Sequence, residues 1–125
     1  MEETKFVTML DGVSTAGANT SDVEEISGAQ KVGFVITRAD HTAGNTVYKF
    51  QGSIDNVDFF DLNLIVPNVT NANTETLTRA ASVTLSSATS SMIWLDLDHA
   101  IIRYIRAVAT ITTDGSATVK MVYEQ

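Results

Sequence analysis

Carboxylates gather at two places along this chain where a cation could be held. Asp55, Asp58 and Asp61 surround one turn, and Asp96 and Asp98 stand two residues apart on one strand. Carboxylate oxygens at a turn are the ligands that Ca²⁺ prefers. The spacing lacks the pattern of an EF-hand loop, so solvated turn carboxylates are the simpler interpretation. We predict no metal and no cofactor, and keep Asp55, Asp58 and Asp61 as the candidate calcium ligands.

Nucleophilic catalysis would need a histidine beside a serine and an acid. The chain has two histidines, His41 in a loop and His99 beside Asp98, and it has no cysteine. Serine is abundant, but there is no Gly-x-Ser-x-Gly turn and no acid is spaced to orient either histidine. We therefore predict that the protein is not an enzyme.

The single tryptophan, Trp94, is the main candidate for binding. In a strand it shares a face with Asp96 and Asp98, and an exposed tryptophan between carboxylates suits a sugar platform or a protein interface. The alternative is that Trp94 lies in the core. Both interpretations stay open because the opposite face is equally apolar, with Ile93, Leu95 and Leu97.

The elements that must position these residues are short segments with period-2 alternation. We expect strands over Lys5–Leu10, Asp22–Ile26, Gln30–Arg38, Thr46–Ile54, Phe59–Val66, Leu77–Ser86, Ser91–Asp98, Ile102–Thr112 and Ala117–Glu124. Loops are expected over Asp11–Thr20, Ala39–Asn45 and Asn68–Glu75, with tight turns at Asp55-Asn56 and Thr113–Ser116. Pro67 should end its strand.

Evenly spaced strands of this kind predict an all-β fold. We expect one antiparallel β-sandwich domain over residues 1–125, a jelly roll with about eight strands, in which residues 1–20 could form an extended N-terminal arm. A helical turn over Asp98–Ala107 is the one rival, and its β-branched content favours a strand. Within the sandwich, Gly52 is expected to let its strand bend.

Composition narrows the choice of partners. The chain of 125 residues is 44% hydrophobic, which is enough for a core, and its net charge is −7. An acidic surface repels phosphate backbones and anionic lipids, so we expect neither a nucleic-acid nor a membrane partner. The start, MEETKFV, shows no signal peptide, and no apolar run is long enough to cross a bilayer.

Three motifs in a fixed order resemble a known group of proteins. They are Gln51–Leu62, with Gly-Ser-x-Asp and a following aromatic residue, then Asp98–Arg106, and then Gly115–Val119. This order, over roughly residues 46–125, resembles the small jelly-roll virion proteins of tailed phages: head decoration, cement and fibre-like proteins. The same motifs are similar to those of discoidin-type, carbohydrate-binding sandwiches. The tryptophan usual in the first motif is Phe59 or Phe60 here.

The resemblance implies a structural virion protein that binds the outer surface of a capsid as a decoration or cement protein. Its partners would be the major capsid protein or another virion protein, and copies of itself, with a trimer expected first. It would be located in the virion, after synthesis in the host cytoplasm. The alternative is a carbohydrate-binding module, or a receptor-binding fibre or tail domain that recognises glycans. The candidate interface residues are Trp94, Asp96, Asp98, Lys5 and Phe6.

Overall fold

The structure is a computed structural model, and it describes residues 4–71, 74–95 and 102–124. These residues contain strands and no helix, and so none of them belongs to a helix that could cross a membrane. The all-β prediction is confirmed.

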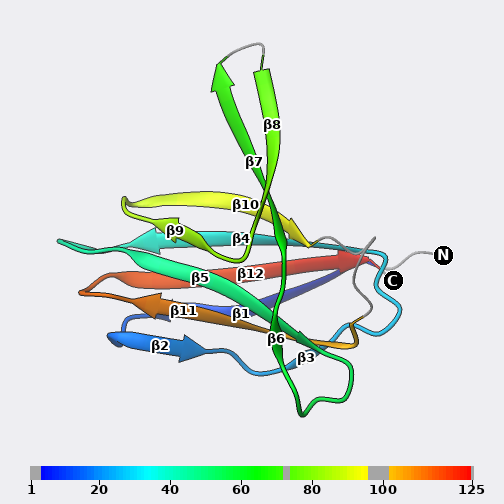
Figure 1. Ribbon diagram of the computed structural model, residues 1–125. Helices are drawn as coiled ribbons and strands as arrows, with labels where there is room; N and C mark the ends of the chain where they lie inside the picture. The colour runs from blue at the N-terminus through cyan, green and yellow to red at the C-terminus, as the bar shows by residue number, and fades with distance from the viewer. Residues whose placement is uncertain (1–3, 72–73, 96–101, 125) are drawn as a thin grey trace.

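The described residues form twelve strands in two antiparallel sheets, as Figure 1 shows. Sheet A has the order β1-β12-β4-β10-β7-β8, and sheet B has the order β2-β11-β5-β6, with β3 beside β11 and β9 beside β5. Sheet A contains β1 (Thr4–Val13), β12 (Ser116–Glu124), β4 (Lys31–Ala39), β10 (Thr89–Leu95), β7 (Leu64–Asn71) and β8 (Thr74–Ala80). Sheet B contains β2 (Gly17–Thr20), β3 (Glu24–Glu25), β11 (Tyr104–Ile111), β5 (Thr46–Ser53), β6 (Phe60–Asp61) and β9 (Val83–Leu85).

The strand order is that of a jelly roll. Four strands of sheet A, β1-β12-β4-β10, face β2-β11-β5-β9 of sheet B. Along these eight strands the chain changes set at every step except from β5 to β9, which are neighbours in sheet B. Seven of these eight strands overlap segments that the sequence predicts as strands, and β2 lies in a predicted loop. The remaining strands are the short β3 and an insertion between β5 and β9.

Alternation along each strand builds the core between the sheets. In β4 and β12 every second residue is buried, and β11 from sheet B contributes Ile105, Ala107, Ala109 and Ile111. Phe34 of β4 and Phe50 of β5 meet across the core with ring centroids 3.8 Å apart. The period-2 pattern therefore places one face of each sheet inward, as expected for a sandwich.

The strand predicted to end at Pro67 continues past this residue, in the insertion between β5 and β9. β7 continues through Pro67 to Asn71 and pairs with β8, so the predicted loop Asn68–Glu75 is largely a hairpin that projects from the sandwich in Figure 1. Among the described residues, β7 pairs with β10 at Leu64 and Ile65 alone. Pro67 lies beyond that contact, where β8 is the one described strand beside β7, and a proline is tolerated at an edge that needs no donor.

Other predicted boundaries are also wrong. β1 extends to Val13 and β2 lies inside the predicted loop Asp11–Thr20, so residues 4–20 lie along β12 and β11 instead of extending away as an arm. The predicted strand Leu77–Ser86 is divided, because β8 belongs to sheet A and β9 to sheet B.

Turn chemistry follows the sequence more closely. Asn56 has a φ of 61°, and Gly115 in the Thr113–Ser116 turn has a φ of 113°, as the left-handed backbone of tight turns requires. Glycine is favoured at position 52 because of space and not because of the backbone conformation. A Cβ there would lie 2.9 Å from Leu62 and 3.0 Å from Ile102, so the strand needs the space rather than a bend.

Candidate functional site

The outer face of sheet A carries a continuous row of apolar residues across five strands. Phe6 pairs with Val122, Val122 with Gly33, Gly33 with Trp94, and Trp94 with Ile65, so all five positions lie at one level of the sheet. Residues directly opposite one another in antiparallel strands point to the same face. A second row, two residues along, contains Thr8, Lys120, Val35 and Met92. The register therefore builds a largely apolar surface from strands far apart in the sequence.

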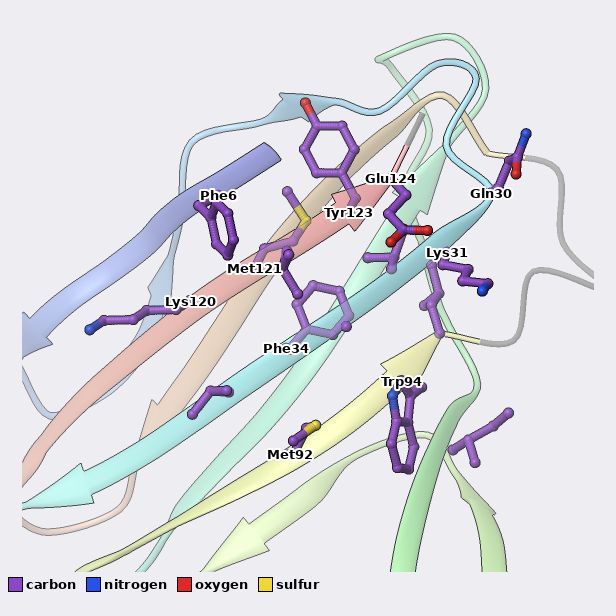
Figure 2. A pocket seen from close by; sticks show the side chains of 16 residues that line it. Phe6, Gln30, Lys31, Phe34, Met92, Trp94, Lys120, Met121, Tyr123 and Glu124 are labelled. Carbon is purple, nitrogen blue, oxygen red and sulfur yellow. The ribbon is translucent and has the colours of Figure 1, made fainter. Parts of the chain in front are cut away.

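These two rows enclose a groove of about 680 Å³. Figure 2 shows Phe6 on one side of it and Trp94 and Met92 on the other. Phe6 is 80% exposed, Met92 53% and Trp94 37%, values that are high for large apolar side chains. Gly33 forms the floor, and a Cβ there would only come into ordinary contact, 3.7 Å from both Trp94 and Val122. We call this surface the sheet A groove.

Charge on the sheet A groove is opposite to that of the chain. Its charged lining residues are Lys31, Lys120 and Glu124, whereas the whole chain has 15 acids and 8 lysines and arginines. Among the described residues Lys120 is exposed and has no ion-pair partner. An apolar groove with two lysines is suited to a partner that presents apolar and acidic side chains.

Of the predicted calcium ligands, Asp55 and Asp58 lie in the loop between β5 and β6, and Asp61 lies in β6. Asp55 Oδ1 accepts hydrogen bonds from the backbone N–H groups of Asp58 at 3.0 Å and Val57 at 2.9 Å, and these bonds lower the pKa of Asp55. Asp61 accepts a hydrogen bond from Gln51 at 3.0 Å, which together with Lys49 at 3.6 Å lowers the pKa of its carboxyl group. The described residues contain no group of three acidic or histidine side chains that could hold a metal ion. Asp55 therefore closes a turn.

The same loop presents apolar side chains to solvent. Val57 is 75% exposed, Phe60 70% and Ile54 66%. Ser53 fixes the loop from below, since its hydroxyl group donates to Asp55 at 2.9 Å and accepts from the N–H of Asn56 at 2.9 Å. We call residues 54–60 the acidic loop. It is apolar at its tip, acidic at its sides and held in place by its own hydrogen bonds.

Arg106 connects the acidic loop to sheet B. Its guanidinium group lies 4.0 Å from the centre of the Phe59 ring, and its Nε donates to Gln51 at 2.9 Å. Arg103 precedes β11, is exposed and pairs with Glu25 at 3.9 Å. Neither arginine enters the core, and both stabilise the surface of sheet B.

A buried arginine, Arg38, lies near the turn between β11 and β12 and is not among the predicted site residues. Arg38 is 1% exposed and its Nη2 donates to the carbonyl of Ala43 at 3.0 Å. Asp114 faces it across the turn and binds the hydroxyl and N–H of Thr42, which lower the pKa of Asp114 to about 2. Burial raises the pKa of the nearby Tyr48 to about 12, an effect that Arg38 partly offsets. Alternation could have indicated Arg38, because it follows Phe34 and Ile36 on the inward face of β4.

The predicted site residues are distributed as follows. Trp94 and Phe6 come together in the sheet A groove, and Ile93 and Leu95 on the opposite face are buried. Lys5 alternates with Phe6 and is half-buried. Asp96, Asp98 and His99 lie outside the described residues. Within the part of the chain that is described, Nδ1 of His41 is buried without a hydrogen-bond partner.

No protein-family model matches the sequence, and neither does any curated protein. Among solved structures, the chain is similar to the SPBc2 prophage-derived protein YomS, with a TM-score of 0.68, 11% identity, and coverage of 100% of this chain and 96% of that chain. Similarity at this identity shows a shared fold. A chain of infectious bursal disease virus, Gx strain, aligns with a TM-score of 0.36 and 13% identity over 99% of this chain and 41% of that one, too low a score to carry an argument.

Proposed function

We propose that this chain is a non-enzymatic structural protein of a phage virion, and that it binds the outer surface of the capsid as a decoration or cement protein. The observation that carries the proposal is the similarity in fold, over nearly the whole of both chains, to a prophage-derived protein. Jelly rolls are frequent in capsid proteins and in lectins, so the fold leaves two classes to separate.

The surface favours broad protein contacts over a small-molecule pocket. β1 is an edge strand: among the described strands it pairs with β12 alone, so one side of its backbone is free to accept a strand from a partner. Lys5 and Phe6 belong to this strand. We propose that the β1 edge contacts the major capsid protein or another virion protein, and that copies of this chain assemble as a homo-oligomer, with a trimer expected first.

The test is co-sedimentation with empty shells assembled from the major capsid protein of the same phage. Saturable binding of the wild-type protein is the expected result, and wild-type protein that stays in the supernatant would overturn the proposal. Successive N–H groups of a strand point to opposite edges, so Thr4→Pro and Lys5→Pro form a matched pair. One of them disrupts the ladder with β12, and the other changes only the free edge. The variant that keeps its melting temperature should lose binding to shells.

Glycan recognition is the second candidate, because Trp94 is partly exposed in a groove that also offers Lys31 and Glu124. A carbohydrate-binding module, or a fibre or tail domain, would use Trp94 as a stacking platform. Retention of the protein on a polysaccharide column, with loss of retention in Trp94→Ala, would support this function. Immunogold labelling of particles separates a head location from a tail location.

A further inference from the structure

The sheet A groove and the acidic loop have matching chemistry on opposite sheets of one molecule. The groove is apolar and carries Lys31 and Lys120. The acidic loop carries exposed Val57 and Phe60 beside Asp55 and Asp58, and Asp61 directly follows it. The groove carries positive charge and the loop carries negative charge, and both present apolar side chains that a contact would bury.

We propose that the sheet A groove binds the acidic loop of a second copy of this chain, with Val57 and Phe60 against the apolar floor and Asp58 beside Lys120. This inference rests on the homo-oligomeric part of the proposed function, and it names the contact. The chain has a net charge of −7, so a second copy supplies carboxylates that suit the lysines of the groove.

The loop is prepared for docking. Ser53 and Asp55 close it through hydrogen bonds of 2.9–3.2 Å, and the Arg106 guanidinium packs on the Phe59 ring at its base. A segment that is already ordered loses little conformational entropy on binding. Burial of the apolar tip is therefore opposed by little further loss of conformational entropy in the loop.

The geometry also fixes the type of assembly. The groove belongs to sheet A and the loop follows β5 of sheet B, so the contact joins two different surfaces. Such a head-to-tail contact closes into a ring when the rotation between copies allows it and otherwise extends as a filament. The trimer expected from the family resemblance is one possible ring.

The experiment uses one variant for each surface. Met92→Glu places a negative charge in the groove, and Val57→Asp does so at the tip of the loop; both side chains are exposed, so both variants should fold. Gly33→Val, which fills the floor at an ordinary contact distance, is a second groove variant. Val23→Asp is the matched control, because Val23 is an exposed apolar residue outside both surfaces. Far-UV circular dichroism verifies the fold of each.

Sedimentation equilibrium should show wild type and Val23→Asp associating, and each groove or loop variant as a 13.5 kDa monomer. A mixture of Met92→Glu and Val57→Asp should give a one-to-one dimer and nothing larger, because one intact groove then meets one intact loop. Lys120→Glu mixed with Asp58→Lys should associate although neither does so alone. A monomeric wild type, or a loop variant that associates as wild type does, would overturn the inference. Shell binding is measured separately, so either proposal can fail without the other.

Discussion

Phe34 and Phe50 stack across the core with an interplanar angle of 24°, one ring from each sheet. Both are essentially inaccessible to solvent. We expect Phe50→Ala to lower the free energy of unfolding by about 3–5 kcal/mol, through lost burial and the cavity left behind. In a double-mutant cycle with Phe34→Leu and Phe50→Leu, the coupling should be about 0.5–1.5 kcal/mol. Urea denaturation measures both values, and strictly additive effects would contradict the stacking contribution.

Gly52 should not accept a methyl group without cost. Its Cβ would approach Leu62 and Ile102 at 2.9–3.0 Å, and both side chains pack against the core. We expect Gly52→Ala to destabilise the protein by about 1–3 kcal/mol through overpacking. Gly33→Ala is the matched control, because its Cβ meets only ordinary contacts at 3.7 Å or more. In thermal unfolding, Gly52→Ala should have a lower melting temperature than Gly33→Ala. Equal melting temperatures would refute the predicted overpacking at Gly52.

Asp114 should make stability depend on pH in the acid range. The hydroxyl and N–H of Thr42 and the N–H of Ala43 lower its pKa in the folded protein to about 2, from 3.8. A lowered carboxyl pKa stabilises the fold fully above the unfolded value and loses that contribution as the pH falls toward 2. Asp114→Asn should therefore be less stable than wild type at pH 7.

The pH comparison also provides its own control. The difference between wild type and Asp114→Asn should shrink between about pH 4 and pH 2, where the carboxyl group takes up its proton. Melting temperatures at several pH values, measured in constant ionic strength, follow this change. A difference that stays constant down to pH 2 would mean that the carboxylate charge has no part in closing the turn.

Calcium should leave the melting temperature unchanged. Asp55 is engaged with two backbone N–H groups, and Asp61 with Gln51 and Lys49, so neither is directed at a common point with Asp58. A ligand that binds the folded state raises its stability by linkage. Thermal scans in millimolar calcium and in EDTA should coincide. A higher melting temperature in calcium, abolished by Asp58→Asn, would reinstate the calcium site.

The sequence predicts most of the jelly-roll strands because their period-2 alternation is regular, but it places the short β2 in a loop. It does not predict that Phe59–Val66 divides into β6 and β7, or that Leu77–Ser86 divides into β8 and β9. A change of sheet depends on which neighbouring strands are present and leaves no local pattern. The strand end predicted at Pro67 is wrong for a similar reason. A proline ends a strand only if both edges are paired, and pairing is a property of the tertiary structure.

The groove is partly predictable. Trp94 and Phe6 are candidates from their residue types, but their placement on the two sides of one groove depends on the registers of β1, β12, β4 and β10. These registers join residues that are far apart in the chain, and a single sequence carries no signal of them. The position of Gly33 at the floor of the groove cannot be predicted from the sequence for the same reason.

The strand order has a consequence for biosynthesis. β12 lies between β1 and β4, and β11 lies between β2 and β5, so the central strands of both sheets are the last to be translated. Until they emerge, β1 has no partner within its sheet and the inner edge of β4 is open. Completion of the fold must therefore follow translation of β11 and β12. Chains that terminate before β11 would expose unpaired apolar strands, the species most prone to aggregate.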